Sequence, residues 1–140
     1  MTLLDVNVWV AAVWSRHVHH RRAKDWVDDR VDEMAFCRVT EQGLLRLVTN
    51  PAVTGRDVRT RRQAWDLLLD LQSDPRIRYV AEPPGLAPLW IAFSKRDDQH
   101  HLLWTDDYLA AFAQAGGLSL VTFDRAMRAR YPSVDVLTLA

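Results

Sequence analysis

Short apolar runs alternate along the chain with longer segments whose apolar residues recur every three or four positions. Short runs of this kind predict buried strands, whereas the longer periodic segments predict amphipathic helices. Strands are expected at residues 2–6, 34–39, 77–81, 119–123 and 134–139, the last being either a strand or a terminal extension. Helices are expected at residues 7–15, 18–31, 41–49, 60–71, 87–95 and 105–116, and in a short segment after Asp124.

Polar residues that can cap helices mark where several of these segments begin. A capping side chain accepts a hydrogen bond from a free backbone N–H of the first helical turn. The residues expected in this role are Thr40, Thr60, Thr105 and Asp124. Asn50-Pro51 is expected to end the third helix, because proline disfavours a helical backbone in the residue before it.

Strands that alternate with helices predict an α/β fold with a parallel sheet covered on both faces. The 140 residues fit one domain, and a hydrophobic composition of 49% is sufficient to build its core. In sheets of this kind ligands bind beyond the carboxyl ends of the strands, near the point where the strand order reverses. Functional residues are therefore expected at that edge.

Acidic residues stand at or just beyond the expected edge, and they are Asp5, Glu41, Asp106 and Asp124. Taken singly, the last three have structural explanations as helix caps or as partners of a helix dipole. Asp5 is different, because it interrupts the apolar run from Leu3 to Val10. A buried carboxylate costs on the order of several kcal/mol unless it is paired, and several at one edge would repel one another. A hard divalent cation is the usual way to relieve that repulsion.

The composition leaves nucleic acid open as a partner. The net charge is zero, but of 18 basic residues only Lys24 and Lys95 are lysines, so 16 are arginines. Arginine can bind a phosphate through two parallel hydrogen bonds. A genome rich in arginine codons explains the excess of arginine over lysine equally well. There is no apolar run of about 18 residues, so no membrane span is expected. The N-terminus lacks a secretion signal, and the single cysteine, Cys37, fits a reducing cytoplasm.

Short motifs at four places resemble those of a known family. They are Leu-Leu-Asp-Val-Asn at residues 3–7, Thr-Glu-Gln-Gly-Leu-Leu-Arg at 40–46, Thr-Asp-Asp-Tyr-Leu at 105–109 and Thr-Phe-Asp-Arg at 122–125. In this order and spacing they look like the motifs of PIN-domain ribonucleases. The segment at residues 48–51 and the chain length look most like VapC-type toxins of bacterial toxin–antitoxin pairs. The resemblance covers nearly the whole chain. It implies a single PIN-like domain over residues 1–140, with three layers and a central parallel sheet of about five strands.

The resemblance also implies roles for individual residues. By position, the catalytic residues that hold Mg²⁺, or Mn²⁺ in its place, are Asp5, Glu41, Asp106 and Asp124. Asn7 and Thr122 match polar positions that support such ligands through hydrogen bonds. Many relatives have a small residue at the position of Asp107. Neighbouring helical residues point about 100° apart, so only one of Asp106 and Asp107 can face the ion, and we expect Asp106 to do so.

Other residues near the motifs are open to more than one interpretation. Arg46 and Arg125 are candidates for contacting a substrate phosphate, and structural ion pairs with the acids are equally expected. The tryptophans fall mostly on apolar faces, which favours core or dimer packing over base stacking. The histidines lack the ligand spacing of a zinc site and are expected on solvated helix ends or on an RNA-facing rim.

The leading hypothesis is therefore a magnesium-dependent endoribonuclease that acts as the toxin of a type II toxin–antitoxin system. The resemblance implies an RNA substrate, a small antitoxin that occludes the acidic groove, a homodimer and a cytoplasmic location. Two alternatives stay open: a receiver- or phosphatase-like phosphoryl-transfer domain, and an inactive RNA- or protein-binding module on the same scaffold. The first alternative needs a lysine near the phosphate, and Lys24 and Lys95 are poorly placed for that.

Overall fold

The computed structural model describes residues 1–140 and contains one five-stranded sheet. Its strands are β1 (Thr2–Leu4), β2 (Met34–Phe36), β3 (Ile77–Tyr79), β4 (Ser119–Thr122) and β5 (Val136–Thr138). All neighbouring strands are parallel, in the order β3-β2-β1-β4-β5. The predicted α/β fold with a parallel sheet is therefore confirmed, although each strand is shorter than the segment predicted for it.

Helices connect the strands. They are α1 (Val6–Val13), α2 (His20–Asp28), α3 (Arg38–Val48), α4 (Pro51–Thr54), the 3-10 helix η1 (Gly55–Asp57), α5 (Arg61–Gln72), α6 (Leu86–Ser94), α7 (Trp104–Gly116) and α8 (Met127–Arg130). Every predicted helical segment is present, and α4 and η1 are two short helices that the sequence pattern did not predict. None of these helices is long and apolar enough to pass through a bilayer.

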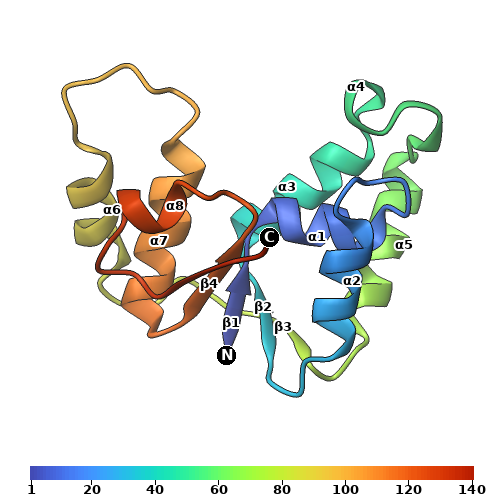
Figure 1. Ribbon diagram of the computed structural model, residues 1–140, viewed down its shortest axis with the longest axis horizontal. Helices are drawn as coiled ribbons and strands as arrows, with labels where there is room; N and C mark the ends of the chain where they lie inside the picture. The colour runs from blue at the N-terminus through green and yellow to red at the C-terminus, as the bar shows by residue number, and fades with distance from the viewer.

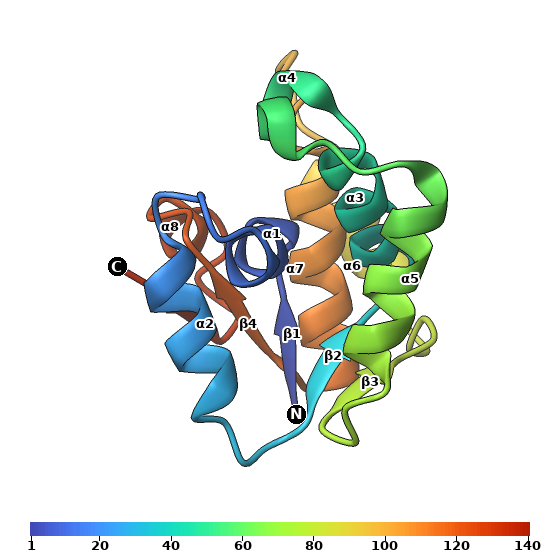
Figure 2. The ribbon, with the colours of Figure 1, turned by 90° about the vertical axis from the view of Figure 1, so that its right-hand side faces the viewer.

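Each face of the sheet has its own hydrophobic core, because successive strand residues point to opposite faces. Leu3 of β1 packs with buried residues of α6, α7 and α8 on one face. Leu4 packs with buried residues of α1, α3 and α5 on the other, where the ring of Trp9 stacks on Phe36 with centroids 4.0 Å apart. Figures 1 and 2 show the resulting three layers, with α6 to α8 on one side of the sheet and α1, α2, α3 and α5 on the other.

Capping by side chains is confirmed at the start of α5. The Thr60 side-chain oxygen accepts a hydrogen bond from the Gln63 N–H at 3.1 Å, and the Gln63 side chain accepts one from the Thr60 N–H at 2.8 Å. The missed helix α4 begins in the same manner, since Asn50 accepts a hydrogen bond from the Ala52 N–H at 3.0 Å. Proline suits the first turn of a helix, so Asn50-Pro51 starts α4 as well as standing beyond the end of α3.

The other three predicted caps are wrong by two or three positions. Thr40 lies within the first turn of α3, and its hydroxyl accepts a hydrogen bond from the Cys37 N–H at 2.9 Å. Thr105 lies inside the first turn of α7, whose start has no side-chain cap. Asp124 accepts a hydrogen bond from the Ala126 N–H at 2.8 Å, but in the turn before α8 rather than at its N-cap. Polar side chains near the start of a helix can thus bond to several nearby N–H groups, so the sequence does not fix the first residue of the helix.

The order and direction of the three central strands place the acidic segments of the chain at one edge of the sheet. β1 lies between β2 and β4, and the three strands run in the same direction. The segments that follow their carboxyl ends therefore emerge side by side, at the point where the strand order reverses. Helices α1 and α3 approach each other closely there. A Cβ added to Gly43 of α3 would lie only 2.5 Å from Cγ2 of Val6 in α1, so the close approach requires glycine.

Candidate functional site

Asp5 lies at the middle of this edge, directly after β1 and before α1. Only 7% of the residue is exposed, and its Oδ2 accepts a hydrogen bond from the Thr122 hydroxyl at 2.8 Å. Its burial raises the pKa of the carboxyl, and the hydrogen bond from Thr122 opposes that rise only in part. No arginine, lysine or histidine forms an ion pair with Asp5. The structure therefore contains a buried carboxylate without a cationic side-chain partner.

Asn7 and Thr122 tie the end of β4 to the start of α1. Thr122 is fully buried, and its hydroxyl oxygen accepts hydrogen bonds from Asn7 Nδ2 at 3.2 Å and from the Asp124 N–H at 3.0 Å. The side-chain oxygen of Asn7 accepts a further hydrogen bond from the Phe123 N–H at 3.2 Å. Both residues therefore fix the position of Asp5, directly or through one intermediate. Their role in supporting a bound ion stays a prediction.

Asp106 and Asp124 are joined by one arginine. Asp106 lies in the first turn of α7 and Asp124 follows β4, and Nη2 of Arg130 donates to Oδ2 of each, at 2.9 and 2.5 Å. Burial, followed by the negative charge of Asp5, raises the pKa of Asp106 to about 6. Burial alone would raise the pKa of Asp124, but hydrogen bonds from the Ala126 N–H and from Arg130 lower it overall. We refer to Asp5, Asp106 and Asp124 as the acid cluster.

The neighbouring residue Asp107 points elsewhere. It is only 8% exposed and accepts a short hydrogen bond from the hydroxyl of Tyr131, which is itself buried. Asp106 instead contacts Arg130, and the negative charges of Asp5 and Asp124 raise its pKa. The geometry thus assigns different surroundings to the two adjacent carboxylates, with Asp106 facing the acid cluster and Asp107 facing Tyr131.

Glu41 is equally buried but has its own partners. It is 5% exposed in the first part of α3, beyond the end of β2. Its Oε1 accepts from Nη1 of Arg38 at 2.6 Å and its Oε2 from Nε2 of Gln72 at 2.7 Å. Glu41 therefore stands beyond the strand adjacent to Asp5, and both of its oxygens are already hydrogen-bonded. Its predicted place among the metal ligands is untested by these contacts.

The donor set of the acid cluster is suited to a hard divalent cation. Carboxylate oxygens are the ligands that Mg²⁺ prefers, and Mg²⁺ takes one or two of them directly while keeping several waters. No three carboxylate, imidazole or thiolate side chains lie close enough together to hold one ion among them. The cluster therefore fits a cation held by one or two carboxylates and through water, rather than a cage of four side chains.

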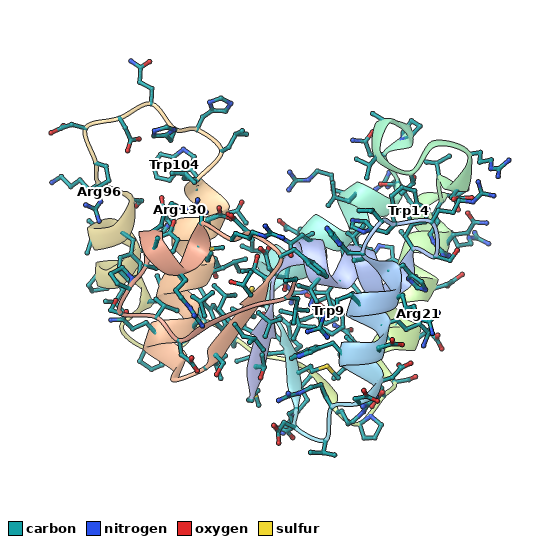
Figure 3. All side chains as sticks on the ribbon, viewed as in Figure 1. Trp9, Trp14, Arg21, Arg96, Trp104 and Arg130 are labelled. Carbon is teal, nitrogen blue, oxygen red and sulfur yellow. The ribbon has the colours of Figure 1, made fainter.

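Arginine contacts differ from the sequence expectations. Arg46 and Arg125 are both exposed, and neither forms an ion pair with an acid. Their contact with a phosphate stays a prediction. The arginine at the acid cluster is Arg130, whose side chain points toward the sheet edge in Figure 3. The basic stretch after Asp124 was a signal for it, but nothing in the spacing distinguished Arg130 from Arg125 or from the intervening Arg128.

Comparison with known proteins agrees with this fold. The family model of the PIN domain matches residues 2–131. The chain is 42% identical to Ribonuclease VapC41 of Mycobacterium tuberculosis, over 100% of this chain and 99% of that protein. It is 33% identical to Ribonuclease VapC38 of the same species, over 89% of this chain and 85% of the relative. The chain therefore belongs to the PIN domain family, among the VapC ribonucleases.

Solved structures show the same fold at low sequence identity. A chain of VapBC2 from Rickettsia felis, bound to a DNA fragment from its promoter, matches with a TM-score of 0.67 and 14% identity, covering 99% of this chain and 98% of that one. A chain of FitAB bound to a DNA fragment matches with a TM-score of 0.70 and 17% identity, covering 99% and 94%. At such identities the likeness concerns the fold, and it confirms the PIN-like architecture.

Proposed function

We propose that this protein is a magnesium-dependent endoribonuclease that cleaves RNA phosphodiester bonds as the toxin of a type II toxin–antitoxin system. The observation that carries the proposal is the acid cluster, in which the charges of Asp5 and Asp124 raise the pKa of Asp106, and only Asp106 and Asp124 share an arginine. The full-length similarity to proteins named ribonucleases supports the substrate class. Mn²⁺ is the alternative ion, because its ligand preference is similar.

The four acids have distinct proposed roles in holding the ion. One or two of Asp5, Asp106 and Asp124 would hold it directly and the rest through water, and Glu41 would join them through water by exchanging its hydrogen bonds with Arg38 or Gln72. When bound, Mg²⁺ would make a nearby water more acidic and stabilise negative charge on the phosphoryl oxygens. Thr122 and Asn7 would keep the Asp5 carboxylate in one orientation, so that little reorganisation is needed when RNA arrives.

Asp106 or Asp124 is the proposed acceptor of the proton that the attacking water loses. A general base works best when its pKa lies near the working pH. Without an ion, burial and the charge of Asp5 raise the pKa of Asp106 to about 6, whereas the pKa of Asp124 is lowered. A bound cation would lower the pKa of a carboxylate that it contacts, so the base would be whichever of the two does not hold the ion directly.

Arg130 is the proposed contact for a non-bridging phosphate oxygen. Its Nη2 already lies within hydrogen-bond distance of Asp106 and Asp124, and its buried Nε has no hydrogen-bond partner. Two carboxylates therefore do not satisfy all of its donors. A guanidinium beside the acids would attract the RNA backbone that the carboxylates alone would repel.

An antitoxin partner, a homodimer and a cytoplasmic location complete the proposal. The solved structures that share this fold include VapBC and FitAB complexes, described with both components or with DNA. We propose that a small protein encoded beside this chain binds it and covers the acid cluster. No observation favours the phosphoryl-transfer alternative, because Lys24 pairs with Asp28 on its own helix at 2.6 Å rather than with an acid of the cluster.

Cleavage of total RNA tests the proposal. The wild-type protein, Asp5→Asn and the exposed control Asp66→Asn would each be incubated with RNA in Mg²⁺ and in EDTA, with folding checked by circular dichroism. We expect fragments from the wild type and Asp66→Asn in Mg²⁺ only, and none from Asp5→Asn. Equal cutting by the wild type and Asp5→Asn would contradict the proposal. RNA that is bound tightly but left intact would support the inactive binding module instead.

A further inference from the structure

A cavity of about 620 Å³ lies beside the acid cluster, on the far side of Arg130. It is enclosed by the end of α6, the loop at residues 95–103, the start of α7 and the residues after α8. We call it the Trp104 pocket, and its principal walls are Phe93, Arg96, His100, Trp104, Arg130 and Tyr131. Its volume lies within the range of roughly 300–1,000 Å³ that is usual for sites of small organic groups. In Figure 3 the labelled side chains Arg96, Trp104 and Arg130 lie in this part of the molecule, below the arch of the loop.

The pocket and the acid cluster share a wall. Arg130 lines the pocket and at the same time donates to Asp106 and Asp124. Trp104 begins α7, two residues before Asp106 in the same helical turn. A phosphate held by Arg130 would therefore have the pocket on one side and the carboxylates on the other.

An exposed tryptophan forms part of the pocket. Trp104 is 58% exposed, although a side chain of this size is usually covered in a folded domain. It is supported by Trp90, whose ring meets it edge-on with centroids 6.4 Å apart, and Trp90 in turn meets Tyr108 edge-on at 5.7 Å. The exposed ring is thus backed by a row of aromatic rings from α6 and α7. Such a ring offers a stacking surface to a planar ligand.

The charge of the pocket favours an anionic ligand. Its lining includes the exposed cations Lys95 and Arg96, neither of which forms an ion pair, and Arg130, which is paired with Asp106 and Asp124. The carboxylates of the lining are Asp98 and Asp107. Asp107 is already hydrogen-bonded by Tyr131, whose hydroxyl donates to it. Exposed cations together with an aromatic surface and polar side chains are the features that bind single-stranded nucleic acid, where the backbone is held electrostatically and the bases stack.

We propose that the Trp104 pocket receives the RNA nucleobase next to the cleaved phosphate, with the base stacked on Trp104. The inference rests on the proposed ribonuclease function and adds a specificity-determining residue to it. Arg130 stands between the base and the acid cluster, so the pocket would set which nucleotide is placed at the carboxylates. This assigns to Trp104 a role that sequence periodicity had attributed to core or dimer packing.

Nuclear magnetic resonance of the tryptophan indole N–H groups tests the proposal without any cleavage. The ¹⁵N-labelled protein would be titrated with the four nucleoside monophosphates and with ribose 5-phosphate, which carries the sugar and phosphate but no base. Trp104→Phe assigns the signal of Trp104, and Trp65 of α5, which is 50% exposed, is the matched control. We expect at least one nucleotide to move the Trp104 signal, while ribose 5-phosphate and the Trp65 signal show no such change. An unmoved Trp104 signal, or an equal response to ribose 5-phosphate, would overturn the proposal.

Cleavage by Trp104→Ala and Trp65→Ala separates this inference from the function on which it rests. Loss of one stacking contact is expected to raise KM about tenfold or more and to alter the cleavage positions in Trp104→Ala, whereas Trp65→Ala cuts as the wild type does. Unchanged KM and positions in Trp104→Ala would overturn the pocket while leaving the ribonuclease intact. If the wild type fails to cut RNA, the proposed function fails, and the resonance titration still decides whether the pocket binds a base.

Discussion

Two buried carboxylates lie beyond adjacent strands of the same sheet, and their hydrogen-bond partners differ in charge. Asp5 is 7% exposed and Glu41 is 5% exposed, so their burial is nearly equal. Glu41 is held by the Arg38 guanidinium and by an amide of Gln72, one on each oxygen. Asp5 has only neutral donors, which are the Thr122 hydroxyl and the backbone N–H groups of Val6 and Asn7, and with its burial and the negative charge of Asp124 its pKa is raised.

This difference indicates which carboxylates of the site need a bound cation to balance their charge. At Glu41 the chain supplies its own positive charge, so the carboxylate is stable without a ligand. At the acid cluster a single arginine serves Asp106 and Asp124, and Asp5 has no cation. A carboxylate kept without a partner is unfavourable for folding, and such groups are concentrated at functional sites. The free energy of binding a divalent ion is therefore expected to come chiefly from the Asp5 side of the edge.

The largest expected difference is in cleavage by Asp106→Asn and Glu41→Gln. Removing a carboxylate of the acid cluster should lower kcat by more than about 100-fold, the upper end of the effect of losing a residue that only supports a ligand. Glu41→Gln should lower it less, because Arg38 and Gln72 already engage Glu41. Single-turnover cleavage with folding monitored in parallel makes the comparison. Equal losses would contradict the expectation that the hydrogen bonds from Arg38 and Gln72 reduce the share of Glu41 in holding the ion.

A smaller effect is expected from Thr122→Val, which removes the one hydroxyl that donates to Asp5. Residues that orient a ligand typically change metal affinity by about 10–100-fold, so calorimetric titration with Mg²⁺ should show a loss of that size. Thr122→Ser keeps the hydroxyl and should bind almost as the wild type does. Equal affinities of the Val and Ser variants would show that Asp5 does not depend on this hydrogen bond.

The pH dependence of stability should reveal the repulsion within the cluster. The pKa of Asp106 is 3.8 in an unfolded chain and about 6 in the folded protein, so the folded state binds the proton more tightly. Its contribution to stability is therefore full below pH 4 and is lost as the pH rises to about 6. In EDTA, the stability of the wild type relative to Asp106→Asn should fall by about 1–2 kcal/mol over that range. Urea unfolding at several pH values measures it, and a pH-independent difference would contradict the raised pKa.

The smallest effect is expected at Arg38, on the Glu41 side. Its side chain is 62% exposed, so solvent screens its charge, but the Glu41 carboxylate that it contacts is 7% exposed and would keep only the Gln72 amide. Arg38→Ala should therefore lower the free energy of unfolding by about 1 kcal/mol and leave the cleavage rate within a few-fold of wild type. A large drop in cleavage with an unchanged fold would mean that Arg38 contacts RNA and belongs to the site.

The fold and the position of the four acids beyond the strands were accessible from sequence because both depend on local patterns. Apolar periodicity predicted all five strands in the correct order along the chain. Asp5 stood out because a charge within an apolar run is locally improbable. Asn7 and Thr122 followed from their motifs, and they do lie in one hydrogen-bond chain with Asp5.

Long-range contacts account for what the sequence could not provide. The separate surroundings of Asp106 and Asp107 depend on Arg130 and Tyr131, which lie 24 residues further along the chain. The partner Gln72 of Glu41 is 31 residues away on another helix. The Trp104 pocket is formed by a loop without periodic pattern that folds over the start of α7. Such pairings depend on tertiary packing, and the positions of the two residues along the sequence do not predict them.

Binding of Mg²⁺ in the absence of RNA tests most directly whether the acid cluster captures a cation. Isothermal titration would compare the wild type, Asp5→Asn and the exposed control Asp66→Asn, all shown to be folded. We predict saturable binding by the wild type and Asp66→Asn, and binding at least about tenfold weaker in Asp5→Asn, since each tenfold step corresponds to about 1.4 kcal/mol of lost interaction. Equal affinity of the wild type and Asp5→Asn for Mg²⁺ would contradict the account.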